Sequence, residues 1–191
     1  MFRLSVCHEL GHAVIRHLFD EMALEVNRPD QRPLPIDLLS FVPRAGVTAS
    51  VALKLGDNPA KTLQYYYAEM SSNYGGRAAE YLFGDGHVSA GPGNDIYHLS
   101  LLGEEAVAQK GLGQTLGASN LSQLSGLEFQ QRSQADKQKL ASSTEHAAMS
   151  VVNFYGDFIR SSADRFLPLA KQGATNDLIW SGTDFTQAAH E

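Results

Sequence analysis

Residues 8–12 of this 191-residue chain read H-E-x-x-H, and this motif constrains the fold and the chemistry more than any other segment. Successive residues of an α-helix lie about 100° apart around its axis, so His8 and His12 project from one face, one turn apart. Two imidazoles so placed can bind one metal ion, while Glu9 on the adjoining face can act on a water molecule as a general base. The motif therefore predicts a Zn²⁺ site with His8 and His12 as ligands and Glu9 as the base.

Composition excludes several other classes of protein. The net charge is −6 and the chain has no cluster of basic residues, which argues against nucleic-acid binding. The single cysteine, Cys7, excludes an internal disulfide, and we interpret it as a small buried filler. No apolar run reaches the roughly 18–20 residues that span a bilayer. The sequence also lacks the G-x-x-x-x-G-K-[ST] phosphate-binding loop, so we expect no P-loop ATPase domain within this chain. We expect a cytoplasmic location.

Hydrophobic periodicity predicts helices for most of the chain and two short strands. The first helix is expected from about Phe2 to Glu25 and carries the motif. Three prolines make residues 28–35 a loop. Residues 38–42 and 47–53 have the composition of strands. The expected fold class is mainly α with a small β-sheet or hairpin (α+β).

A second long helix is expected to begin at the capping group Asp57-Asn58-Pro59 and to end at Phe83. Gly75 and Gly76 lie in its interior, where each glycine costs about 1 kcal/mol relative to alanine. We therefore predict that another backbone, such as that of the first helix, lies close against these glycines.

The remaining elements are expected to be helical and connected by polar segments. They are a helix from about Asp95 to Lys110 capped by Asn94, a flexible surface segment or partner-contacting loop at 111–126, a polar helix at 129–163 broken near Tyr155-Gly156, a shorter helix at 163–171 and a final turn capped by Thr183-Asp184. We expect residues 1–125 to form a zinc-binding catalytic core and residues 126–191 a helical C-terminal part of the same domain.

A catalytic zinc ion usually takes three protein ligands, so one ligand must come from outside the motif. His17 is a poor choice for this ligand, because it follows His8 by nine residues and lies about 180° around the same helix. Spacing favours Asp95, which would start a helix after a glycine-rich loop, and Glu80 is the nearest alternative. The full set of candidates is Glu80, Asp85, His87, Asp95, His98, Glu104 and Glu105.

Five short blocks resemble, in the same order, the peptidase domain of the FtsH-type AAA proteases, which are membrane-bound ATP-dependent zinc proteases. Residues 8–13 resemble H-E-A-G-H-A, and residues 42–48 resemble a segment with P-R-G and G-x-T. Residues 75–84 resemble G-G-R-A-A-E-E-L-x-F-G, and residues 89–96 resemble T-T-G-A-x-N-D-I/L. Residues 111–117 resemble G-M-S followed by L-G.

The resemblance implies that Asp95, the aspartate of the N-D pair, is the third zinc ligand. It also implies a mostly helical fold with a small β-hairpin region, assembly into a hexameric ring, and an AAA ATPase module acting in cis or in trans. The module and the membrane segments of the family are absent from this sequence. No convincing capping residue precedes the first helix, so we expect a truncated domain or an unusually short member of its class. A segment outside this sequence could place it at the inner face of a membrane.

We therefore expect a zinc metalloendopeptidase that hydrolyses unfolded polypeptides. Glu80 and Asn94 are predicted to support the ligands, since partners of this kind fix the orientation of a ligating imidazole. An extended substrate is predicted to pair with the strand that contains Val47, Thr48 and Val51. His87 and His98 are interpreted as surface residues.

Two alternatives remain open at this point. One is a catalytically silent, zinc-stabilised domain that assembles or regulates a protease ring. The other is a metal-dependent hydrolase whose substrate is a small-molecule amide.

Overall fold

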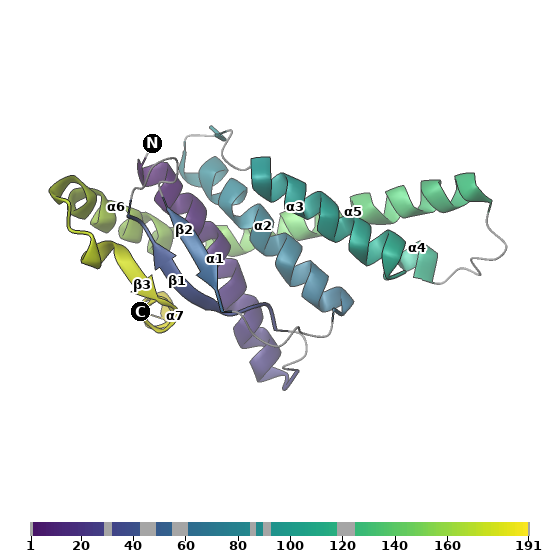
Figure 1. Ribbon diagram of the computed structural model, residues 1–191, viewed down its shortest axis with the longest axis horizontal. Helices are drawn as coiled ribbons and strands as arrows, with labels where there is room; N and C mark the ends of the chain where they lie inside the picture. The colour runs from purple at the N-terminus through teal and green to yellow at the C-terminus, as the bar shows by residue number, and fades with distance from the viewer. Residues whose placement is uncertain are drawn as a thin grey trace.

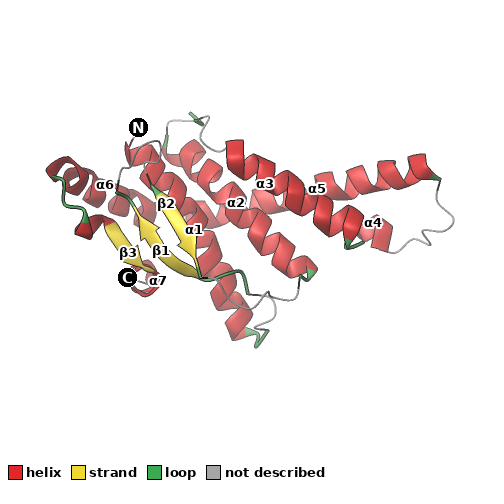
Figure 2. Ribbon diagram, in the orientation of Figure 1, coloured by secondary structure: helices red, strands yellow, loops and turns green. Residues whose placement is uncertain are grey.

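The chain forms seven α-helices and three strands within the residues that this computed structural model describes, which are 2–28, 32–42, 49–54, 61–84, 87–89, 93–117 and 125–190. The long helices are α1 (Phe2–Glu25), α2 (Leu63–Phe83), α3 (Gly93–Glu104), α5 (Gly126–Phe154) and α6 (Gly156–Gln172). Shorter elements are the π-helix η2 (Glu105–Gln109), α4 (Gln114–Gly117), the 3₁₀-helix η4 (Asn176–Leu178) and α7 (Gly182–His190). The expected mainly α architecture with a small sheet is confirmed (Figures 1 and 2).

The three strands form one antiparallel sheet in the order β2-β1-β3, which lies against α1 (Figure 2). They are β1 (Ile36–Ser40), β2 (Ser50–Leu53) and β3 (Ile179–Ser181). Leu39 lies in the central strand β1, where it pairs with Val51 of β2 on one side and with Trp180 of β3 on the other. Residues 43–48, which join the two expected strands and include the start of the second, lie outside the described residues.

The expected strand at 38–42 was displaced by two residues, because β1 begins at Ile36 and ends at Ser40. Beyond its end, the backbone N–H of Phe41 donates to the carbonyl of Leu178, 2.8 Å away, at the end of η4. The strand β3 was not placed from the sequence. It has only three residues and pairs with a strand about 140 positions away, which local patterns do not report.

The start expected for the second long helix was wrong, although its end at Phe83 is confirmed. Lys61 and Thr62 are not helical, and the Thr62 side chain accepts a hydrogen bond from the backbone N–H of Tyr65 at 3.2 Å, so α2 begins at Leu63. The group Asp57-Asn58-Pro59 lies outside the described residues.

The helix expected at 95–110 begins instead at Gly93, so Asn94 lies within its first turn rather than at its cap. It ends as an α-helix at Glu104 and continues as η2. Part of the segment expected to be a flexible surface loop forms α4, whose Leu116 is buried. The buried Asp136 of α5 accepts hydrogen bonds from the backbone N–H groups of Thr115 and Leu116, and this tertiary contact orders the segment.

The break expected near Tyr155-Gly156 is confirmed, because α5 ends at Phe154 and α6 begins at Gly156. The separate helix expected at 163–171 is the second half of α6. The expected final turn is a full helix, α7. Its cap is Ser181, whose hydroxyl oxygen accepts from the N–H of Asp184 while the Asp184 carboxylate accepts from the Ser181 N–H.

Helices α1 and α2 cross with their backbones in direct contact at Gly11 and Gly75. A Cβ atom at Gly11 would lie 2.2 Å from the carbonyl oxygen of Gly75, and one at Gly75 would lie 2.4 Å from the carbonyl oxygen of Gly11. Neither position can therefore carry a side chain without separating the helices. The prediction that another backbone lies against the glycines of α2 is confirmed.

A buried ion pair holds the same two helices together further along their length. Arg16 of α1 and Glu69 of α2 form two parallel hydrogen bonds of 2.8 and 2.6 Å, and both residues are 7% exposed. Arg16 also donates to the backbone carbonyl of Leu34 at 3.1 Å, which fixes the segment leading into β1. This bidentate geometry compensates for the removal of both charges from water.

The main hydrophobic core lies between α1, the sheet and the C-terminal helices. Phe41, Phe166 and Phe185 are fully buried and surround Trp180 of β3. Cys7 is buried in the same core, as expected. Helix α5 packs on α2 and α6 packs on α1, and the proposed division at residue 125 stays a prediction. Among the described helices, none combines the length and apolar character needed to cross a bilayer.

The glycine contact makes a direct prediction. Gly75→Ala forces the two backbones apart, and we expect it to lower the free energy of unfolding by about 1–3 kcal/mol in urea denaturation. Gly103→Ala in α3 is the matched control, because a Cβ there would meet only Met70 Cε at 3.7 Å. The control should be neutral or stabilising by up to about 1 kcal/mol. Equal stability of Gly75→Ala and wild type would contradict the close crossing.

Candidate metal centre

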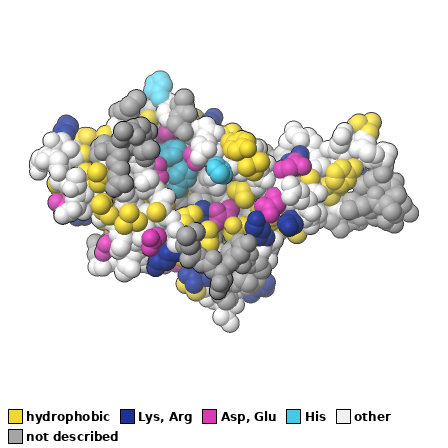
Figure 3. All heavy atoms as spheres, viewed as in Figure 1, with side chains coloured by type: hydrophobic (Ala, Val, Ile, Leu, Met, Phe, Trp, Pro, Cys, Tyr) yellow, Lys and Arg dark blue, Asp and Glu magenta, His cyan; other side chains and the backbone are white. Residues whose placement is uncertain are grey.

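Helix α1 presents His8 and His12 side by side at the crossing with α2. They lie one turn apart on the helix, and their Nε2 atoms are 3.0 Å apart. Both side chains are 13% exposed, so the pair is mostly buried but reachable from solvent. Histidine side chains are visible next to carboxylates on the face of the molecule shown in Figure 3.

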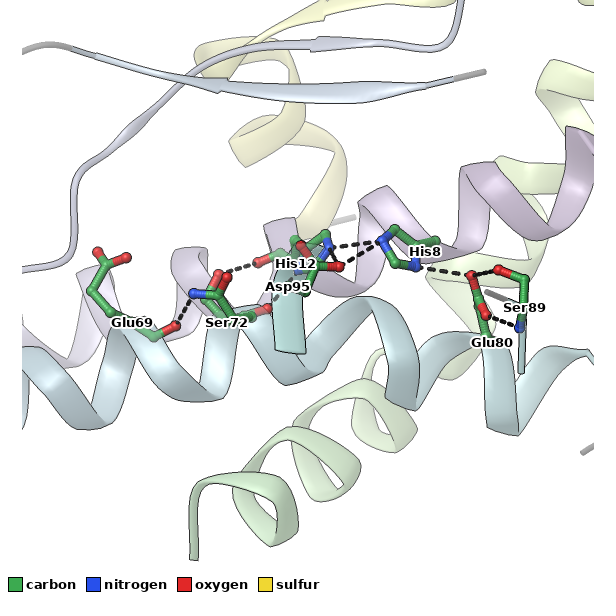
Figure 4. A network of polar contacts seen from close by, with 8 residues as sticks. His8, His12, Glu69, Ser72, Glu80, Ser89 and Asp95 are labelled. Carbon is green, nitrogen blue, oxygen red and sulfur yellow. Dashed lines mark hydrogen bonds and ion pairs between the residues drawn. The ribbon is translucent and has the colours of Figure 1, made fainter. Parts of the chain in front are cut away.

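Asp95, in the first turn of α3, completes a group of three potential ligands. Its Oδ2 atom lies 3.3 Å from His8 Nε2 and 3.5 Å from His12 Nε2 (Figure 4). Tetrahedral zinc with bonds of about 2.0–2.1 Å holds its ligand atoms about 3.3 Å apart. The observed separations of 3.0, 3.3 and 3.5 Å agree with that value, so the three residues fit a zinc ion.

A backbone carbonyl fixes the orientation of the His12 ring. His12 Nδ1 donates to the carbonyl oxygen of Ser72 on α2 over 2.6 Å, which leaves the Nε2 lone pair directed toward Asp95 and His8. The Ser72 hydroxyl in turn donates to the His12 carbonyl at 3.3 Å. These two contacts couple one turn of α1 to one turn of α2.

The buried carboxylate of Glu80 takes the corresponding place beside His8. Its Oε1 atom lies 3.0 Å from His8 Nδ1, but off the direction of the ring N–H, so the contact is electrostatic rather than an aligned hydrogen bond. Glu80 accepts hydrogen bonds from the N–H and the hydroxyl of Ser89, at 2.7 and 3.0 Å. It therefore lies on the side of His8 away from Asp95, where it can support the ring but cannot share a metal ion with it through Nε2 (Figure 4).

Gly76 leaves the space that the two rings occupy. A Cβ atom at this position would lie 2.5 Å from His8 Cε1 and 2.6 Å from His12 Nε2. The glycine pair of α2 thus has two separate functions: Gly75 accommodates the backbone of α1, and Gly76 accommodates its histidines.

The carboxylates shape the electrostatics of the group. Burial alone would lower the pKa of His8, but its contact with Asp95 and the charges of Glu9 and Glu80 raise that pKa above its usual value. Burial alone would raise the pKa of Asp95, but its hydrogen bonds with His12 and His8 hold it well below its usual range. The site therefore concentrates negative charge and favours a cation.

Glu9 is half-buried and follows His8 directly on α1, close enough for its charge to act on that ring. It is not one of the three clustered ligand atoms. This placement, beside the group but outside it, is the one that a general base requires.

The other predicted residues lie elsewhere. Asn94 is exposed at the start of α3, and Val51 is half-buried in β2, while Val47 and Thr48 lie outside the described residues. The remaining candidate ligands do not join the group: His87 and His98 are exposed, Glu104 pairs with Lys137, Glu105 pairs with Lys61, and Asp85 lies outside the described residues.

Sequence reasoning missed two residues of the site. Ser72 acts through its backbone carbonyl, which leaves no signature in the sequence. Ser89 lies in the block that resembles T-T-G-A-x-N-D, and its hydroxyl could have been recognised there as a partner for a carboxylate.

Comparison with known proteins places this geometry in a family. Over 144 residues the chain is 28% identical to the ATP-dependent zinc metalloprotease FtsH of Haemophilus influenzae, which covers 73% of this chain and 21% of that protein. It is also 28% identical over 139 residues to the ATP-dependent zinc metalloprotease FTSH 9, chloroplastic/mitochondrial, of Oryza sativa subsp. japonica, with 72% of this chain and 16% of that protein covered. The chain thus spans about a fifth of the length of these relatives. Residues 3–156 match the model of peptidase family M41, and the chain belongs to that family.

Proposed function

We propose that this chain is a zinc metalloendopeptidase domain that hydrolyses peptide bonds of unfolded polypeptides. The observation that carries the proposal is the convergence of His8, His12 and Asp95 within 3.0–3.5 Å, with Glu9 beside them. Two imidazoles and a carboxylate are a ligand set of catalytic zinc sites, which keep the fourth position open. The two relatives are themselves named zinc metalloproteases.

A bound zinc ion would polarise the scissile carbonyl and lower the pKa of a water molecule at the open position. The protein's own part in hydrolysis belongs mainly to Glu9. Its carboxylate accepts a proton as the water oxygen bonds to the carbonyl carbon, and it returns that proton to the nitrogen as the C–N bond breaks. Ser72 and Glu80 keep the two histidine rings in place throughout.

The edge of β2 is the proposed site for the substrate backbone. Strand β2 is the last strand of the sheet on its side, and it packs on α1, which carries the motif (Figures 1 and 4). Within the described residues, no strand pairs with its outer edge. An extended peptide added there would be bound through its main chain, with little selection of sequence, which suits unfolded substrates.

We further propose that the domain works in a hexameric ring together with an AAA ATPase module, in cis or in trans, which would deliver unfolded chain to the site. The support is that both relatives are named ATP-dependent proteases and that this chain spans about a fifth of their length. By the same resemblance, we propose a cytoplasmic location at the inner face of a membrane.

The ligand assignment is tested by Asp95→Asn, which keeps the shape of the side chain but removes its charge. We expect zinc affinity to fall by more than about 100-fold, because even the loss of a supporting partner costs about 10- to 100-fold. Asp37→Asn on the exposed part of β1 is the matched control and should bind zinc like the wild type. Zinc content after dialysis checks both variants. Undiminished zinc in Asp95→Asn would exclude Asp95 as a ligand.

Catalysis is tested by Glu9→Gln in a casein or peptide hydrolysis assay. The variant should retain zinc but lose about 10²–10⁴-fold in rate, since it cannot accept the proton of water. A chelator should abolish wild-type hydrolysis, and added Zn²⁺ should restore it. If wild type and variant both bind zinc and neither hydrolyses a peptide in any assembled state, the chain is instead a silent, zinc-stabilised domain.

The substrate edge is tested by single proline substitutions at Val51 and Ala52. Consecutive backbone N–H groups of a strand point to opposite sides, so one proline removes an N–H facing β1 and the other removes an N–H facing outward. Thermal melting identifies the outward position, because only the inward proline disrupts the sheet. The outward proline should raise KM for unfolded protein while leaving the melting temperature nearly unchanged. Unchanged cleavage by that variant would exclude strand addition at β2.

A further inference from the structure

His17 lies on α1 but faces away from the metal centre. Glu21 follows one turn later on the same helix, and the proposed peptidase site uses neither residue. His17 is 6% exposed, and its Nε2 atom is fully buried without a hydrogen-bond partner among the described residues. A buried polar atom without a partner costs about 1–3 kcal/mol, so its position calls for a physical explanation.

The ring of His17 is held in place from several sides. Its centroid lies 5.8 Å from that of Phe185 in α7 and 6.4 Å from that of Tyr155 at the α5–α6 junction, both in edge-to-face orientation. The His190 ring of α7 lies 5.1 Å away in the same orientation. Aromatic packing therefore fixes the direction of Nε2 but does not satisfy it.

Two further ligand atoms face the His17 Nε2 atom. Glu21 Oε2 lies 3.5 Å from it, which is too long for a hydrogen bond, and the other oxygen of Glu21 lies 2.8 Å from His190 Nε2. One potential ligand atom from each of the three residues lies within 4.8 Å of the other two. The two contacts of Glu21, one through each carboxylate oxygen, lie on either side of the value of about 3.3 Å that a tetrahedral zinc ion imposes on its ligands.

We propose that His17, Glu21 and His190 bind a second divalent transition-metal ion, which fastens α7 to α1. Two imidazoles and one carboxylate suit Zn²⁺, Co²⁺, Ni²⁺ or Cu²⁺ rather than Mg²⁺ or Ca²⁺, which prefer oxygen ligands. Side-chain exposures of 38% for Glu21 and 57% for His190 leave room for water to complete the coordination.

The protonation of His17 agrees with this assignment. Burial lowers the pKa of His17, and the neighbouring His190 lowers it further, while Glu21 and Asp20 oppose the effect. The outcome is a lowered pKa and a neutral ring at pH 7, which is the form of imidazole that coordinates a metal. Asp20 is itself paired with Arg32, so Glu21 is the carboxylate available to the ion.

The second site is independent of the first. His190 belongs to α7, which lies beyond the residues 3–156 that match the peptidase family, and the site contains no general base corresponding to Glu9. Its consequence is structural: the ion would bridge the helix that carries the peptidase motif and the C-terminal helix, and it would stabilise the docked α7 by mass action.

The test compares metal stoichiometry in wild type and His190→Gln, which keeps a polar side chain beside Glu21 but removes the imidazole. We expect equilibrium dialysis against Zn²⁺ to show one bound equivalent fewer in His190→Gln than in wild type, or binding of that equivalent at least about tenfold weaker. His146→Gln, at an exposed histidine of α5, is the matched control and should bind as many equivalents as wild type. Asp95→Asn should lose the other equivalent only, so failure of the first site and failure of the second are distinguishable.

Hydrogen exchange gives a second readout that locates the ion. Zn²⁺ should slow amide exchange across α7 in wild type and in His146→Gln, but not in His190→Gln. Melting of the metal-free proteins checks that the substitution at this exposed position leaves the fold intact. Equal stoichiometry, equal affinity and equal protection of α7 in all three proteins would overturn the proposal and reduce the cluster to a packed histidine beside a surface ion pair.

Discussion

The contact between the backbones of α1 and α2 at Gly11 and Gly75 is the constraint on which the metal centre depends. The helices run antiparallel, so the polar contacts along their interface follow in reverse order: Arg16 with Glu69, His12 with Ser72, and His8 with Glu80. Residues 72, 76 and 80 of α2 lie four apart and form one stripe that faces the two histidines. Any side chain at Gly75 would separate the helices and withdraw that stripe from the rings.

Contacts from α2 and from Ser89 hold the two histidine rings in the orientation that brings the ligand atoms together. His12 donates through Nδ1 to a backbone carbonyl, and Glu80 holds His8 from its Nδ1 side while Ser89 holds Glu80. Each ring is thus oriented from the side opposite to Asp95. Such preorganisation fixes the Nε2 atoms at a spacing close to that of a zinc site, because the rings are not free to turn toward water.

Much of the fold and part of the site could be predicted from the sequence. The bounds of α1, the close contact at Gly75 and the break at Tyr155 follow from periodicity, glycine placement and local chain breaks. Spacing alone left Asp95 and Glu80 as competing ligands. The family resemblance favoured Asp95, and the tertiary structure gives the physical reason, since the two carboxylates lie on opposite sides of His8. The elements that were missed depend on distant partners: α4 needs Asp136, and β3 needs β1.

Helix α1 uses the same i, i+4 spacing twice, and the difference between the two uses shows how much the surroundings determine. His8 and His12 face α2 and α3, whose residues orient both rings and supply Asp95. His17 and Glu21 face α7, where aromatic rings orient His17 but leave its Nε2 atom without a partner. In the first case a backbone carbonyl accepts a hydrogen bond from His12 Nδ1, and the Nε2 atom is thereby directed toward His8 and Asp95. In the second case a buried nitrogen faces a carboxylate and another imidazole, which is the same combination of ligand types as in the first centre.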